Sequence, residues 1–173
     1  MKMRRREFIT GALAIAGLRT SSTVAKEQDM DNTDDRQFQM HPIGKVKQHD
    51  DYAELQIYDK YTDAVLGLDG FSHAFVMYWF DKNDTPEKRS ILRVHPRGNK
   101  DNPLTGVFAC RAPVRPNLIA LSLCKIVSVE DSTVRVEKID ALDGTAIVDI
   151  KPYIPHIDHP QSDLHTPKWL NKR

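Results

Sequence analysis

Two arginines and an asparagine lie close together on a stretch that is braced by proline. Arg111, Arg115 and Asn117 alternate with Pro113 and Pro116. Proline fixes its own backbone φ at about −65° and restricts the preceding residue to extended conformations, so this segment should hold its polar side chains at fixed positions. Rigid polar groups on a loop between apolar strands are a common way to build a binding site. A proline-rich turn with two solvated arginines fits the same pattern.

A second candidate is the segment over residues 140–145, which reads Asp-Ala-Leu-Asp-Gly-Thr and is expected between two strands. Backbone groups of such a loop can bind the edges of an adenine, and the carboxylate of Asp140 or Asp143 can bind an amine or a hydroxyl. An ordinary Asp-Gly hairpin turn is the alternative. The glycine-rich G-x-G-x-x-G turn of nucleotide-binding α/β folds is absent from the sequence, so any nucleotide site must be of another type.

Basic residues surround the first of these segments. If they converge in space, they form a patch that attracts phosphate, although the formal net charge of +1 gives no global attraction to nucleic acid. For His95 alone, an ordinary histidine at the end of a strand is the alternative. The basic residues are Arg93, His95, Arg97, Lys100, Arg111 and Arg115.

Other reactive residue types point less clearly to a site. Ser72 and His73 lie in an apolar stretch without the surroundings of a nucleophile elbow, so His73 is interpreted as structural or as a wall of a ligand site. The histidines of the C-terminal tail follow no zinc-binding spacing, and no metal site is predicted. Cys110 and Cys124 could pair in an exported protein, or could remain two buried free thiols.

Short strands must position these segments. A helix capped by Asp59 and ended by Gly67, and a polar loop over residues 81–88, interrupt the strand pattern. Trp79 and Phe108 are predicted to lie in the core. Many short strands separated by turns favour a mainly β fold, a small closed antiparallel β-barrel with one or two short helices. The predicted strands cover residues 43–47, 53–57, 71–80, 91–95, 107–109, 118–129, 133–137 and 146–150.

The N-terminal residues differ in composition from the centre of the chain. A basic start, an apolar run rich in Ala and Gly, and small residues up to Ala25 follow one another as in a twin-arginine secretory signal over residues 1–25. We therefore predict export to the periplasm with cleavage after about Ala25 and no membrane integration of the mature chain. A basic tail on a cytoplasmic protein is the alternative. Residues 26–38 predict a disordered acidic linker, 39–158 a single folded domain and 159–173 an irregular tail.

Several motifs together resemble the TrmO family, also described as TsaA-like or YaeB-like. Residues 105–122 are similar to the family signature G-V-F-A-T-R-S-P-x-R-P-N-P-I-G-L-S. Residues 66–73 resemble its G-L-x-G-F-S-H segment, and residues 93–97 resemble R-x-H-P-R. Residues 140–145 and 148–153 resemble D-x-L-D-G-T and V-x-D-I-K-P-Y. These motifs occur in the family's order between residues 40 and 158.

The resemblance implies a β-barrel, usually dimeric, that uses S-adenosylmethionine to N6-methylate threonylcarbamoyl-adenosine beside the tRNA anticodon. Arg115 and Asn117 are then expected to position the methyl acceptor. The implied partners are S-adenosylmethionine, a second copy of the chain and, if the protein is cytoplasmic, the tRNA anticodon loop. By motif, the cofactor contacts fall on Arg111, Leu121, Asp140, Leu142, Asp143, Gly144 and Thr145.

The chain also departs from the family pattern. Leu118 stands where the family has proline, Ala120 where it has glycine, and Asp81 where many members have histidine. The loop over residues 47–51 is shorter than the corresponding segment in bacterial members. The signal-like start, the altered Leu118 and Ala120, and the near-zero net charge leave open an alternative function, that of an exported module that binds an S-adenosylmethionine-type small molecule without acting on tRNA.

Overall fold

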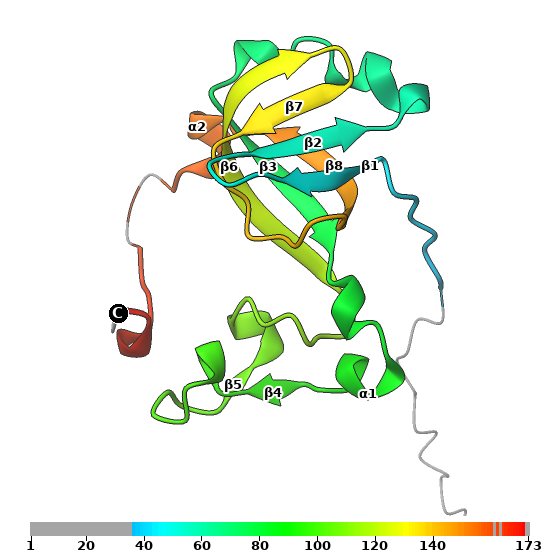
Figure 1. Ribbon diagram of the computed structural model, residues 1–173. Helices are drawn as coiled ribbons and strands as arrows, with labels where there is room; N and C mark the ends of the chain where they lie inside the picture. Colours follow the sequence, from blue (N-terminus) through cyan, green and yellow to red (C-terminus); the bar gives the residue numbers. More distant parts are fainter. Residues whose placement is uncertain (1–35, 161, 163, 172–173) are drawn as a thin grey trace, which may run out of the picture. The chain divides into compact units, whose positions relative to one another are not determined.

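The computed structural model describes residues 36–160, 162 and 164–171 (Figure 1). The chain divides into one unit over Met1–Gln37 and a second over Phe38–Arg173, and the fold given below is that of the second unit. The predicted signal over residues 1–25, and the linker as far as residue 35, lie outside the described residues. Within the described part, no helix is long and apolar enough to cross a membrane.

Six antiparallel strands form a closed barrel, in the order β1-β2-β7-β6-β3-β8. The barrel closes because β1, which starts at Gly44, pairs with β8 as well as with β2. The predicted fold class, a mainly β closed antiparallel barrel with few short helices, is confirmed (Figure 1). The strands are β1 Gly44–Gln48, β2 Ala53–Ile57, β3 His73–Trp79, β6 Ile119–Glu130, β7 Thr133–Val136 and β8 Ala146–Pro152.

The barrel interior is filled from alternating strand positions. Strand β2 buries Ala53, Leu55 and Ile57 because successive side chains of a strand point to opposite faces. Leu55 lies opposite Val46 on β1 and opposite Val134 on β7, and all three are buried. Burying a side chain of this size contributes about 1.5–3 kcal/mol to folding, so these layers fix the strand register.

The outer faces of β3 and β6 are apolar as well. We call this surface the outer apolar strip, and each of its side chains is half-buried or exposed. It therefore lacks the polar alternation that is usual for a solvated face. Its cross-strand pairs are Phe75 with Leu123, Met77 with Leu121, and Trp79 with Ile119.

The segment between β3 and β6 carries most of the short elements, and here several predictions are wrong. The polar loop predicted over residues 81–88 contains the 3₁₀ helix Asp81–Asn83 and helix α1 Pro86–Arg89, which Thr85 caps by accepting a hydrogen bond from the Lys88 amide. The strand predicted over residues 107–109 is the 3₁₀ helix Val107–Ala109, because pairing between β4 Arg93–Val94 and β5 Thr105–Gly106 ends at Gly106.

Three predictions about single side chains also need correction. Phe108 was expected in the core but is 79% exposed, since only Val107 of its helix is buried. Trp79 lies half-buried on the outer face of β3 rather than in the core. Asp59 is the first residue of its 3₁₀ helix, Asp59–Val65, and no side chain caps that helix.

The remaining elements lie outside the barrel wall. Gly67, with a left-handed φ of 81°, separates the helix over residues 59–65 from a second 3₁₀ helix, Leu68–Gly70. A further 3₁₀ turn covers Pro96–Gly98. After β8 come helix α2 Pro155–Asp158 and the 3₁₀ helix Lys168–Asn171.

Both cysteines are free. Cys124 is buried in the barrel, and burial raises the pKa of its thiol to about 11. Cys110 is only half-buried, so the prediction of two buried thiols is correct for Cys124 alone.

Candidate functional site

Two cavities meet at Arg111. The first, which we call the mixed-charge cleft, has a volume of about 320 Å³ and contains both acidic and basic side chains. It forms where the end of β3, the Arg111 loop and the loop over residues 139–145 come together. Its lining residues are Tyr78, Trp79, Phe80, Asp81, Lys82, Asn83, Arg111, Pro113, Ile139, Asp140, Ala141, Leu142 and Thr145.

Tyr78 forms the floor of the mixed-charge cleft. Its side chain is 3% exposed, and its hydroxyl donates a hydrogen bond to the backbone carbonyl of Asp140. The same hydroxyl lies 3.3 Å from the Ser122 hydroxyl. Burial raises the pKa of Tyr78, so the phenol stays neutral at physiological pH and keeps its proton for this contact.

Gln48, at the end of β1, holds the 139–145 loop in place. Its side-chain amide donates to the carbonyl of Ala141 at 2.6 Å and to that of Ile139 at 3.3 Å. Its backbone amide donates to the Asp143 carboxylate at 2.8 Å. One residue therefore fixes the loop at three points, and the rim of the cleft is set before any ligand binds.

Asp143 and Gly144 shape this loop from outside the cleft. Gly144 has a φ of 78°, which only glycine adopts without strain, and its amide donates to the Val46 carbonyl at 2.8 Å. The Asp143 carboxylate accepts from Gln48 and lies 3.6 Å from the Lys47 ammonium, and the Gln48 hydrogen bond lowers its pKa. Neither residue lines the cleft.

Two charged side chains of the mixed-charge cleft are free within the described part of the chain. Neither the guanidinium of Arg111 nor the carboxylate of Asp140 has a hydrogen bond or an ion pair among residues 36–160, 162 and 164–171. Opposite charges that line one cavity without neutralising each other are available to a ligand that carries both charges.

Arg89 of α1 holds the other end of the Arg111 loop. Its guanidinium donates to the Asp84 carboxylate and to the Pro116 carbonyl, each at 2.8 Å, and lies 5.4 Å from the ring of Trp79. Trp79 in turn donates to Asp84 at 3.0 Å. The loop with Arg111 is thus anchored to α1 and to the end of β3.

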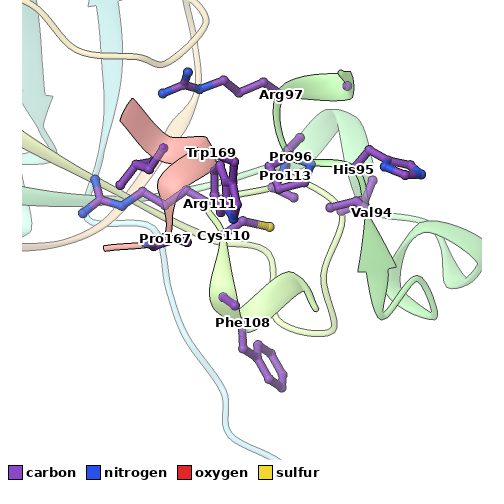
Figure 2. A pocket seen from close by; sticks show the side chains of 15 residues that line it. Val94, His95, Pro96, Arg97, Phe108, Cys110, Arg111, Pro113, Pro167 and Trp169 are labelled. Atoms are coloured by element: carbon purple, nitrogen blue, oxygen red, sulfur yellow. The ribbon is translucent and has the colours of Figure 1, made fainter. Parts of the chain in front are cut away.

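The second cavity, which we call the cationic pocket, has a volume of about 830 Å³. Trp169, Arg111 and Pro113 lie together in its wall (Figure 2). Among the described residues that line it, every side chain of a charged type is basic. Its lining residues are Val94, His95, Pro96, Arg97, Gly98, Phe108, Ala109, Cys110, Arg111, Ala112, Pro113, Val114, Pro167, Trp169 and Leu170.

The sequence matches a known family over most of the folded part. Residues 33–159 match the family described as tRNA-methyltransferase O N-terminal domain. The chain belongs to this family. The resemblance that the sequence motifs predicted is thereby confirmed.

Curated relatives and solved structures agree with this membership. A "Probable S-adenosyl-L-methionine-binding protein" of Methanocaldococcus jannaschii is 43% identical over 124 residues, which cover 72% of this chain and 98% of that protein. The tRNA (adenine(37)-N6)-methyltransferase of Mus musculus is 39% identical over 106 residues, which are 61% of this chain but 24% of that enzyme. A crystal structure of TrmO from Pseudomonas aeruginosa matches with a TM-score of 0.59 at 25% identity, covering 78% of this chain and 62% of that one. The chain thus spans less than two thirds of that structure.

The residues expected from the TrmO-family motifs fall in three places. Arg111, Asp140, Leu142 and Thr145 line the mixed-charge cleft. Leu121 and Arg115 line a neighbouring groove along β6, of about 620 Å³, together with Arg111 and Asp140. Asn117 is exposed and lines none of these three cavities.

The basic residues converge only in part. His95, Arg97 and Arg111 line the cationic pocket, and Arg115 lines the β6 groove. Arg93 and Lys100 line neither. Nδ1 of His73 lies 2.9 Å from the Ser72 hydroxyl, and the His73 ring packs edge-on against Tyr153. His73 lines none of the three cavities.

The departures from the family pattern have different structural meanings. Leu118, just before β6, and Ala120 on β6 are both buried, and neither lines the mixed-charge cleft, although Ala120 lines the β6 groove. Asp81 does line the mixed-charge cleft and adds a carboxylate there. Gln48, Arg89 and Trp169 were not predicted. Gln48 binds carbonyls more than 90 positions away, Arg89 reaches Pro116 across 27 positions, and Trp169 lines a pocket with the distant Arg111 loop, so no local pattern reveals these contacts.

Proposed function

We propose that the chain is an S-adenosylmethionine-dependent methyltransferase that acts on an adenine N6 group beside the tRNA anticodon. The observation that carries the proposal is the pair of free opposite charges, Arg111 and Asp140, in a cleft floored by neutral Tyr78. S-adenosylmethionine carries a carboxylate and an ammonium on its amino acid part. Family membership and the names of the relatives support the same ligand.

The chemistry of the mixed-charge cleft fits this ligand. Arg111 suits its carboxylate and Asp140 its ammonium. The half-buried ring of Phe80, which packs edge-on against Tyr78 with 5.9 Å between the ring centroids, offers an apolar surface to an adenine or to the positive sulfonium. Leu142, 61% exposed at the rim, adds a further apolar contact.

In this function the protein acts mainly by alignment. Bound in the cleft, S-adenosylmethionine supplies a methyl group that its sulfonium has already activated. Arg111 would bind the carboxylate and Asp140 the ammonium, both of which are attached to one carbon of the amino acid part. Gln48 keeps the 139–145 loop, which carries Asp140, in place. Arg115 lines the adjoining β6 groove together with Arg111 and Asp140, and we assign it to the methyl acceptor. Fixing acceptor and methyl donor in line lowers the barrier without a strong chemical catalyst.

Calorimetric titration with S-adenosylmethionine tests the cofactor assignment. We expect saturable binding, which Arg111→Ala weakens and Lys125→Ala leaves intact, because Lys125 pairs with Glu137 outside the three cavities. Methyl transfer to an anticodon stem-loop RNA then tests the substrate. A folded preparation that shows no saturable heat would contradict the proposal at its first step.

A second candidate is an S-adenosylmethionine-binding protein without tRNA activity. The shares of the relatives that the chain matches favour this candidate. The chain matches 98% of the Methanocaldococcus relative, which is named as a binding protein, but only 24% of the mouse methyltransferase. Cofactor binding without any transfer to stem-loop RNA would select this candidate. Robust turnover would exclude it.

We also propose that a second copy of the chain covers the outer apolar strip. Leu121 and Leu123 are 40% and 49% exposed there, next to half-buried Phe75. A strip of this kind is typical of a protein interface. Light scattering during size-exclusion chromatography should give a dimer mass, and Leu121→Glu should shift it toward the monomer. A monomer for the unaltered chain would refute the dimer.

Export remains a proposal based on residues 1–25, which lie outside the described part. Fractionation of the native protein with N-terminal sequencing decides it. A chain starting near Lys26 outside the inner membrane supports export and the second candidate. A chain starting at Met1 in the cytoplasm supports action on tRNA.

A further inference from the structure

The cationic pocket is built partly by residues outside the family match. The match ends at residue 159, whereas Pro167, Trp169 and Leu170 form one wall of the pocket. The Arg111 loop contributes another part of the lining, so the pocket and the mixed-charge cleft share Arg111 and Pro113. A molecule in the pocket would therefore lie beside a ligand in the cleft.

The lining of the pocket is selective in its chemistry. Trp169 and the proline rings offer flat apolar surface, while Arg97 and Arg111 supply positive charge. The complementary ligand has a planar aromatic part and a negative charge. A nucleotide has both, because every base can stack on an indole and every phosphate pairs with a guanidinium.

The basic wall is held rigidly. His95 donates from Nδ1 to the Asn102 carbonyl at 2.7 Å, and the side chain of Asn102 donates to the Pro96 carbonyl at 2.9 Å. Between these contacts Arg97 has a φ of 61°, a left-handed conformation that a residue with a side chain adopts only when its surroundings enforce it. Such enforced conformations are concentrated at ligand sites.

We propose that the cationic pocket binds one unpaired RNA nucleotide, with its base stacked on Trp169 and its phosphate at Arg97 and Arg111. The nucleotide is unpaired because a base inside a duplex cannot present its face to a side chain. The assignment rests on the proposed RNA substrate and adds to it a subsite that the C-terminal tail completes.

Fluorescence titration of the full chain tests the subsite, with an RNA stem-loop and a fully paired RNA duplex as probes. The chain has two tryptophans, Trp79 and Trp169. The stem-loop should quench the part of the tryptophan emission that is lost in Trp169→Phe, while the duplex should not. Trp169→Ala should weaken stem-loop binding roughly 10-fold to 100-fold, and Trp169→Phe should weaken it much less, since phenylalanine still stacks.

Two controls separate failure of the subsite from failure of the proposed function. Leu164→Ala alters an exposed tail residue outside the pocket and should leave stem-loop affinity unchanged. S-adenosylmethionine affinity, measured by calorimetry, should be the same in Trp169→Ala as in the unaltered chain. Equal stem-loop affinity of Trp169→Ala and the unaltered chain, or equal quenching by stem-loop and duplex, would overturn the subsite. If the chain binds RNA in a Trp169-dependent way but does not bind S-adenosylmethionine, only the cofactor assignment is overturned.

Discussion

The mixed-charge cleft and the cationic pocket share one arginine but differ in how they are built. The cleft is floored by a barrel strand, and its rim loop is tied to β1 by the three contacts of Gln48. The pocket lies between the loops outside the barrel and the C-terminal tail. Its charge is of one sign, whereas the cleft has both. The same Arg111 loop therefore takes part in two cavities of different charge, according to which second element completes each cavity.

Arg111→Ala should have the largest effect, because it removes the side chain common to both cavities. Hydrogen bonds to charged groups contribute about 1.5–3 kcal/mol, so S-adenosylmethionine affinity should fall roughly 10-fold to 100-fold. Stem-loop affinity should fall as well. Calorimetry and fluorescence on the same preparation measure the two losses, with Lys125→Ala as the matched control. A loss confined to one ligand would show that the cavities do not share Arg111 functionally.

Asp140→Asn should separate the cavities. It removes the negative charge from the cleft and leaves the lining of the pocket unchanged. An ammonium lacks the two parallel hydrogen bonds that an arginine can make to a carboxylate. We therefore expect a smaller loss of S-adenosylmethionine affinity than for Arg111→Ala, about 5-fold to 10-fold, with stem-loop affinity unchanged or slightly increased. Asp69→Asn, at an exposed position outside both cavities, is the control. Unchanged cofactor affinity would remove Asp140 from the site.

Gln48→Ala should weaken cofactor binding indirectly, because Gln48 holds the loop that forms the rim of the cleft. Two side-chain hydrogen bonds to the 139–145 loop are lost, each of which contributes about 1 kcal/mol net. Urea denaturation should show a destabilisation of about 1–2 kcal/mol. Cofactor affinity should fall a few-fold, while Trp169-dependent RNA binding stays the same. Gln39→Ala, exposed and before the first strand, controls for loss of a glutamine.

Asp143 should give the smallest effect, and it depends on pH. The Gln48 amide lowers the pKa of Asp143 below its ordinary value of 3.8, so the ionised form is favoured in the folded state. The resulting stability is present above that ordinary value and is lost as the pH falls through the lowered one. Asp143→Asn should therefore be slightly less stable than the unaltered chain in urea at pH 7, and the difference should shrink below about pH 4. A constant difference across this range would mean that charge at Asp143 does not matter.

Local sequence patterns predicted the barrel well because its strands are local features. Ala53 to Ile57 alternates in polarity, and the structure buries the same alternate residues. Local sequence patterns failed in short segments, where a few residues are compatible with either a strand or a helical turn. Three apolar residues at 107–109 fit a strand as well as a turn of helix, and the end of β-pairing at Gly106 settles it.

The candidate site was predictable only in its motif residues. Arg111 and Asp140 belong to recognisable segments, and the structure brings both to one cleft. Gln48 carries no local signal because its partners Ile139 and Ala141 lie more than 90 positions away. Trp169 lies in a segment whose composition predicts irregular structure. Its place in a pocket became visible only because the structure shows that it lines this pocket together with the Arg111 loop.

The closure of the barrel has a consequence for how the protein acquires its site. Strand β1 meets β8 only after nearly the whole domain has been synthesised, and Gln48 binds Asp143 across 95 positions of the chain. Contacts of such long sequence separation form late and slowly, because a large loop must close first. The ligand-binding rim is therefore completed in the last stage of folding. Recovery of cofactor binding during refolding should follow closure of the barrel rather than formation of its early hairpins.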